Sequence, residues 1–166
     1  EEMQIEVVND CSNQSIQAEM EAIVKAVGDG RVNFYRHPEQ DVGQTAIFNL
    51  CIQRAQGEWV HILHDDDVVL PGFYNHLREG VAKNPSVGAA FCRHIYTDEM
   101  GNQRWVSWLE RETPGVLTDW LEQIIVMCRL QASPIVVKRS IYESLGGFCP
   151  QAGAASDWEM WKRIAV

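Results

Sequence analysis

The stretch "EWVHILHDDDVVLP" (58–71) joins an apolar run to three consecutive aspartates and a proline. Its first six residues are almost continuously apolar, which is typical of a strand in the middle of a parallel sheet. The adjacent carboxylates of residues 65–67 repel one another and lose hydration near a core, so they need a compensating partner. Proline suits the first position of a helix, and a helix is therefore predicted from about Pro71.

The segments before this stretch alternate between strand and helix patterns. Residues 4–10 and 31–37 have the composition of short strands. Residues 15–28 and 43–57 have the apolar spacing of helices, and each ends at a glycine. Strands and helices that alternate over short connections predict an α/β fold with a mainly parallel central sheet flanked by helices.

The second half of the chain has a less regular pattern. Residues 87–98 and 103–109 are predicted to pair around a turn, and 133–139 to form a further strand. Helices are predicted over 118–128 and from about residue 156. With 166 residues and no internal repeat or linker, the chain is expected to form one domain.

Composition excludes several classes of protein. The net charge of −9 argues against a general nucleic-acid-binding protein, which needs a basic surface. No apolar run approaches the roughly 20 residues of a membrane span, and the first residues do not resemble a signal peptide. The five cysteines are widely spaced without a CxxC pair, which argues against a disulfide framework or zinc site and favours a reducing, cytoplasmic compartment.

Two acidic turns follow predicted strands. Asp10 ends the strand at 4–10, and Asp65, Asp66 and Asp67 follow the later apolar strand. Ligands of parallel sheets bind outside the carboxyl ends of the strands, so both turns are predicted to share one rim of one sheet. A divalent cation, Mg²⁺ or Mn²⁺, held by carboxylates and substrate phosphates would relieve the repulsion.

The acidic run also has a simpler interpretation. Its carboxylates would be favourable at the start of the following helix, which explains one aspartate more readily than three. His64 is a further candidate metal ligand, although a histidine at a strand end is more often a polar residue with a local partner.

A second acidic segment, "SDWEMWKR" (156–163), follows a glycine-rich loop. Ser156 and Glu159 have the spacing of a capping box, which would place Asp157 in the first turn of a helix. An exposed carboxylate fixed in this position also suits a general base. Glu159 has an alternative partner in Arg163, four residues later.

The same segment contains Trp158 and Trp161. These rings are candidates for the wall of a sugar site, although tryptophans at a helix start more often belong to the core.

Four segments in this order resemble glycosyltransferase family 2 with the GT-A fold. They are "VVNDCS" (7–12), "HILHDDDVVLPGF" (61–73), "VVKRSIYESLGGF" (136–148) and "SDWEMWKRIA" (156–165). The resemblance implies a single catalytic domain over 1–166. Its nucleotide-binding half would span about 1–70 and its acceptor half about 71–166.

The resemblance also implies a reaction: metal-dependent, inverting transfer of a sugar from a nucleotide diphosphate donor to an acceptor hydroxyl. UDP is the expected nucleotide, with GDP and TDP as alternatives, and the acceptor is a carbohydrate, a lipid-linked molecule or a protein. Asp157 matches the catalytic base and Asp10 the contact to the uracil. Asp65 is expected to face the ribose or sugar. Asp66, supported by Asp67, is expected to bind Mg²⁺ or Mn²⁺.

The chain departs from the family pattern at several positions. His64 stands where many members have the first aspartate of the metal motif, and Asn9 replaces another aspartate. Asn49 lacks the arginine that often precedes it, whereas Arg163 matches the arginine that often follows the base. The family's first strand and its downstream acceptor elements have no counterpart here, so we expect a fragment truncated at both ends.

Two other functions stay open. A non-catalytic or partial module of the same fold would bind a sugar or a protein without turnover. A nucleotidyltransferase would share the acidic metal site, but it would need a glycine-rich basic loop near the N-terminus, which the sequence lacks. The expected location is the cytoplasm, with a peripheral position at the inner face of the membrane as an open alternative.

Overall fold

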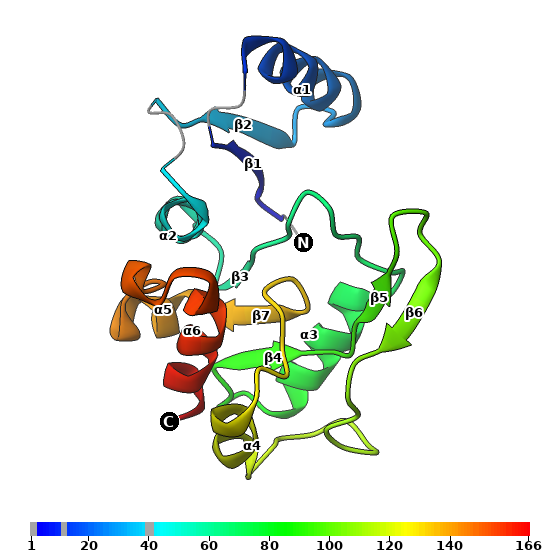
Figure 1. Cartoon of the computed structure of the whole chain (residues 1–166), viewed down its shortest axis with the longest axis vertical. Helices are drawn as coiled ribbons and strands as arrows, with labels where there is room; N and C mark the ends of the chain where they lie inside the picture. Colours follow the sequence, from blue (N-terminus) through cyan, green and yellow to red (C-terminus); the bar gives the residue numbers. More distant parts are fainter. Residues whose placement is uncertain (1–2, 11–12, 39–41) are drawn as a thin grey trace.

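The computed structural model describes residues 3–10, 13–38 and 42–166 (Figure 1). The elements in chain order are β1 (Ile5–Asn9), α1 (Gln14–Val27), β2 (Val32–Arg36), α2 (Gln44–Arg54), β3 (Trp59–His61), α3 (Phe73–Lys83), β4 (Ala89–Phe91), β5 (Ile95–Thr97), β6 (Gln103–Val106), α4 (Trp120–Val126), β7 (Ile135–Lys138), α5 (Arg139–Leu145), the 3-10 helix η1 (Pro150–Ala155) and α6 (Ser156–Ala165). The predicted helices and strands are present within a few residues at their ends, except that residues 87–98, predicted as one strand, form β4 and β5 in different sheets. Two short helices, α5 and η1, were not predicted.

The strands form three sheets. β1 pairs with β2 in parallel, β5 pairs with β6 in antiparallel, and a three-stranded sheet has the order β3-β7-β4. Both β3 and β4 are antiparallel to β7, which lies between them. The α/β class is confirmed, but the parallel pairing expected through residues 58–63 is replaced by antiparallel pairing. A continuous apolar run shows that a strand is buried, and it does not show the direction of its neighbour.

The prediction that both acidic turns share one rim of one sheet is wrong for the described residues. Asp10 follows β1, whereas the run 65–67 follows β3, and these strands belong to separate sheets. β1 is hydrogen-bonded to β2 alone and β3 to β7 alone among the described strands.

The core lies between the three-stranded sheet and helices α2, α4, α5 and α6. Ile124, Val137, Met160 and Trp161 are at most 2% exposed and pack in one cluster. Burial of each such side chain stabilises the fold by roughly 1.5–3 kcal/mol. Helix α6 is therefore anchored in the core, and this helix carries Asp157 in its first turn. In Figure 1 it lies beside α5 and close to α4.

The first three elements form a separate layer at one end of the molecule (Figure 1). Helix α1 presents much of its apolar side to solvent, because Ile16, Ile23 and Val27 are 45–76% exposed while the polar Gln17 is buried. Polar contacts join this layer to the end of α2. Glu6 forms an ion pair with Arg54.

Candidate functional site

The loop between β3 and α3 brings three potential metal ligands together. His64, Asp66 and Asp67 each offer one ligand atom, and these atoms lie within 4.8 Å of one another. The two aspartates are exposed and the histidine is half-buried. Asp65 does not belong to this group. The assignment of Asp66, Asp67 and His64 as metal ligands stays a prediction, and the structure brings these three residues together.

The chemistry of this group fits a divalent cation. Carboxylate oxygens suit Mg²⁺ and Mn²⁺, and imidazole is a common ligand for transition metals. Nε2 of His64 is buried and has no hydrogen-bond partner in the described part of the chain. An unpaired buried nitrogen is costly, and a nearby cation or ligand atom would compensate it.

Ser133, which precedes β7, holds the acidic loop in place. Its hydroxyl donates a hydrogen bond to the carboxylate of Asp67, and it accepts one from the backbone N–H of His64 at 3.3 Å. Ser133 is buried. No signal in the sequence points to this residue, because it lies more than 60 positions from the loop and belongs to no motif. It acts as a positioning residue for the candidate metal ligands.

Replacing Ser133 with alanine is expected to weaken Mn²⁺ binding by about 10–100-fold, the usual cost of losing a partner of a metal ligand. The loop would lose both hydrogen bonds, and Asp67 would be free to turn away. Electron paramagnetic resonance of free Mn²⁺ measures this affinity. Ser144→Ala is the matched control, because that hydroxyl bonds only the carbonyl of Ile141. Equal affinities of both variants and the parent would contradict the assignment.

His61 contacts Ser133, the residue that positions the acidic loop. Its Nε2 lies 2.7 Å from the carbonyl oxygen of Ser133, and its Nδ1 lies 3.0 Å from the hydroxyl of Tyr74. A carbonyl can only accept, so Nε2 carries the proton of the neutral ring and Nδ1 accepts from Tyr74. Burial lowers the pKa of His61, and the bond to Ser133 offsets part of that effect.

This shift predicts a loss of stability in acid. The pKa of His61 is lower in the folded than in the unfolded state, so the unfolded chain binds more protons between the two values. The free energy of unfolding should therefore fall as the pH drops below about 6.5. Urea unfolding at pH 7.5 and 5.5 measures the change, and His61→Gln should show a smaller one. An equal change in this variant would contradict the assignment.

Asp157 lies in the first turn of α6, as predicted, but the capping box does not form. Ser156 already belongs to the helix, and its hydroxyl lies 3.4 Å from that of Thr45. Glu159 pairs with Arg163 at 2.7 Å. The (i, i+4) pairing therefore replaces the capping contact. Asp157 itself accepts a hydrogen bond from the backbone N–H of Trp158 at 2.6 Å.

The carboxyl group of Asp157 has the properties of a base at neutral pH. It is half-buried, where it was expected to be exposed. Burial raises its pKa, and the backbone N–H groups and the nearby charge of His64 offset part of the rise. A raised pKa makes a carboxylate a stronger proton acceptor, as a general base requires. His64 and Asp157 both lie beside α2, because the ring of His64 is 5.1 Å from that of Phe48 and Ser156 lies beside Thr45.

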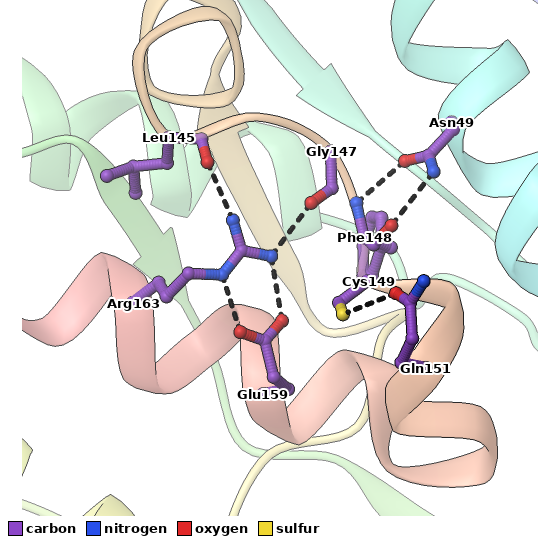
Figure 2. A network of polar contacts seen from close by, with 8 residues as sticks. All are labelled: Asn49, Leu145, Gly147, Phe148, Cys149, Gln151, Glu159 and Arg163. Atoms are coloured by element: carbon purple, nitrogen blue, oxygen red, sulfur yellow. Dashed lines mark hydrogen bonds and ion pairs between the residues drawn. The ribbon is translucent and has the colours of Figure 1, made fainter.

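A network of polar contacts fixes residues 145–148, the loop that precedes the segment with Asp157 in the sequence (Figure 2). Asn49 on α2 donates to the carbonyl of Phe148 at 2.9 Å and accepts from its backbone N–H at 2.7 Å. Arg163 donates to the carbonyls of Leu145 and Gly147 at 2.9 and 2.8 Å. A Cβ atom at Gly147 would lie 2.1 Å from the side-chain oxygen of Asn49, so only glycine fits. The network positions the start of the 150–157 segment.

Asn49→Ala is expected to lower the free energy of unfolding by about 1–3 kcal/mol, because both backbone groups of Phe148 lose their partner in a partly buried position. Urea denaturation measures this value. Asn75→Ala, an exposed asparagine on α3, should change stability by less than about 0.5 kcal/mol. A similar small effect at both positions would show that the loop does not depend on Asn49.

Asp10 does not belong to the group of His64, Asp66 and Asp67. It follows β1, and its carboxylate accepts a hydrogen bond from the backbone N–H of Val42 at 3.3 Å. Cys11 and Ser12, the rest of the predicted turn, lie outside the described residues. The predicted contact between Asp10 and a nucleotide base stays a prediction.

Residues 1–146 match the model of the family described as Glycosyl transferase family 2. The chain belongs to this family. The match includes the acidic loop and ends before Asp157 and helix α6. The role of Asp157 therefore depends on the geometry described above. No curated protein sequence is significantly similar to the chain.

Solved structures of glycosyltransferases share the fold. The mannosyltransferase PcManGT from Pyrobaculum calidifontis, in complex with GDP-Man and Mn²⁺, has a TM-score of 0.66 and 19% identity, covering 98% of this chain and 42% of its own. TarS 1-349 from S. aureus in complex with UDP has a TM-score of 0.73 and 16% identity, covering 96% of this chain and 44% of its own. TarS 1-349 in a second structure has a TM-score of 0.67 and 13% identity, covering 99% of this chain and 46% of its own.

At these identities the likeness shows the GT-A fold alone. The chain spans less than half the length of these structures. Among the described helices, none combines the length and apolar character needed to span a bilayer.

Proposed function

We propose that this chain is the catalytic part of a metal-dependent, inverting glycosyltransferase that uses a nucleotide diphosphate sugar. The observation that carries the proposal is the placement of two acidic sites beside helix α2 in a family 2 chain. The ring of Phe48 on this helix lies 5.1 Å from that of His64, which groups with Asp66 and Asp67. The hydroxyl of Thr45 on the same helix lies 3.4 Å from that of Ser156, which precedes the half-buried Asp157. Residues up to about 70 would bind the nucleotide, and residues from about 71 would bind the acceptor.

The donor side would be built on the acidic loop. Asp66 and Asp67, with His64, would hold Mg²⁺ or Mn²⁺, and such an ion offsets the negative charge that develops on a departing diphosphate. Asp65 would face the ribose or sugar and Asp10 the base. UDP is the first nucleotide to test, and GDP is the second, because the mannosyltransferase structure holds GDP-Man with Mn²⁺.

Asp157 would perform the proton transfer. Its carboxylate would take the proton of an acceptor hydroxyl, whose oxygen then forms a bond to the anomeric carbon. The bond from that carbon to the diphosphate oxygen breaks on the opposite face, so the configuration inverts and no covalent enzyme intermediate is needed. Burial favours this role, because it keeps water from competing for the carboxylate and raises the pKa of the base.

The chain's four described cysteines, Cys51, Cys92, Cys128 and Cys149, are all free. Free thiols are typical of reducing compartments, so we place the enzyme in the cytoplasm. A peripheral position at the inner face of the membrane stays a prediction. The same holds for the choice among carbohydrate, lipid-linked and protein acceptors.

The test is incubation of the chain with Mn²⁺ and a panel of UDP-, GDP- and TDP-sugars. Release of the nucleoside diphosphate should occur with one of them, and early NMR spectra should show the sugar with inverted anomeric configuration. Retention of configuration would exclude the single displacement. Nucleotide binding without release from any donor would favour the non-catalytic module instead.

A further inference from the structure

A pocket of about 460 Å³ lies along the hairpin formed by β5 and β6. This hairpin is at the right-hand edge of the molecule in Figure 1. Two tryptophans, Trp105 and Trp108, line it, and both are about 60% exposed. Tyr96 extends this aromatic wall, because its ring lies 4.6 Å from that of Trp105 at an angle of 31°. The pocket therefore exposes aromatic surface to solvent, with the guanidinium of Arg129 over the ring of Trp108 at 5.3 Å.

This exposure contrasts with the tryptophans of the "SDWEMWKR" segment. Trp161 is buried in the core, and Trp158 donates its indole N–H to the carbonyl of Ile124 at 2.6 Å. These two residues, candidates for a sugar wall from the sequence, support the fold. Exposed aromatic surface lining a concave site indicates a binding site rather than a packing role.

The pocket also carries hydrogen-bond donors. Arg93 lines it and is exposed, and it donates from Nε and Nη2 to the carbonyl of Ser107 at 3.0 and 2.8 Å. In the described part of the chain it has no carboxylate partner, unlike Arg129, which pairs with Glu110 at 2.8 Å. Aromatic faces together with donors match the two sides of a sugar ring, its C–H face and its hydroxyl edge.

One wall of the pocket adjoins the acidic loop. The backbone of His94 is bonded to Ser107 in the pocket wall, through its N–H to the serine hydroxyl at 3.0 Å and through its carbonyl to the serine N–H at 2.8 Å. The ring nitrogens of His94 are buried and lack partners among the described residues. Burial lowers the pKa of His94, and the charge of Asp67 acts against this.

Another wall adjoins the candidate base. Cys128 lines the pocket, and its pKa is raised by burial and further by the negative charge of Asp157. Hydrogen bonds connect both walls to these groups. The backbone N–H of Cys92, two residues before His94, donates to the carbonyl of Pro134 at 3.1 Å, and Pro134 follows Ser133, which holds Asp67. Cys128 follows α4, whose Ile124 carbonyl accepts the indole N–H of Trp158, the neighbour of Asp157. A molecule bound in it would be close to both groups needed for transfer.

We propose that this pocket is the acceptor site, and that it binds a carbohydrate whose rings lie against Trp105 and Trp108 with a hydroxyl directed toward Asp157. This inference rests on the proposed function. It selects a carbohydrate from the acceptor classes that the family resemblance left open. Arg93 then donates to a hydroxyl group of the bound sugar.

The test is binding of the chain to a glycan array, with the variants Trp105→Ala, Trp108→Ala and the double variant. The parent should bind at least one class of glycan, and each tryptophan variant should bind at least about 10-fold more weakly, a tenfold change being about 1.4 kcal/mol. Trp105→Phe, which keeps a ring face, should retain more affinity than Trp105→Ala. Ile125→Ala is the control, because Ile125 is 60% exposed on α4 and does not line the pocket.

Circular dichroism must show that each variant is folded, and titration with UDP and GDP in the presence of Mn²⁺ must give the same result as for the parent. Binding to no glycan, or binding that the double variant retains, overturns the inference. The inference is also overturned if the parent chain co-sediments with anionic phospholipid vesicles and both the tryptophan variants and Ile125→Ala weaken this binding. That result would indicate a surface that binds membranes. Nucleotide binding without glycan binding refutes the pocket alone, whereas glycan binding without nucleotide binding refutes the proposed transferase.

Discussion

Replacement of Asp157 by asparagine is expected to reduce the release of nucleoside diphosphate from the donor by about 10²–10⁴-fold, the usual contribution of a general base. Asparagine has nearly the same shape but cannot accept the proton of the hydroxyl. The affinity for the nucleotide should not change, because that binding depends on the acidic loop. Release is measured with a coupled assay, and nucleotide binding is measured by titration.

The pH dependence gives a second readout of the same residue. Because the pKa of Asp157 is raised, the rate should fall in acid at a pH above the ordinary range of an aspartate, as the base becomes protonated. This acid limb should be absent from the residual rate of Asp157→Asn. Asp119→Asn makes the same chemical change at the start of α4 and should leave the rate unchanged. An equal loss in both variants would refute the role of Asp157.

Replacement of Asp66 by alanine is expected to weaken Mn²⁺ binding by at least about 100-fold, since loss of a direct ligand should exceed the 10–100-fold cost of losing an outer partner. Asp66 is exposed, so the fold should tolerate the change. The concentration of free Mn²⁺, followed by electron paramagnetic resonance in the absence of nucleotide, gives the affinity.

Asp65→Ala is the control for this experiment. Asp65 is the immediate neighbour of Asp66 and has the same charge. It does not belong to the group of potential ligands formed by His64, Asp66 and Asp67. Its replacement should change Mn²⁺ affinity by only a few fold. An equal loss at both positions would show that the run binds cations through its summed charge and not through a defined set of ligands.

The sequence predicted the elements better than their pairing. Apolar periodicity shows which residues are buried, and it located β3, α2 and α6 for this reason. It could not show that β7 would insert between β3 and β4 in the antiparallel direction. The apolar spacing of residues 15–28 also located α1, but it does not show whether a partner surface is present, and Ile16, Ile23 and Val27 are exposed.

The candidate site was predictable where several charges are adjacent in sequence. Asp66 and Asp67 were found because three like charges at a strand end need an explanation. Ser133 and Asn49 were not assigned their positioning roles, since each acts on a segment more than 60 residues away. The predicted capping box does not form, because Glu159 pairs with Arg163 and not with the backbone at Ser156. Local spacing does not decide between these two partners. Long-range hydrogen bonds of this kind require the fold.

The most direct test of the central claim is calorimetric titration of UDP, and then GDP, into the chain with and without Mn²⁺. Binding of one nucleotide that requires Mn²⁺ is expected, because the exposed carboxylates of Asp66 and Asp67 repel a diphosphate unless a cation lies between them. Absence of binding for both nucleotides at saturating Mn²⁺ would contradict the claim.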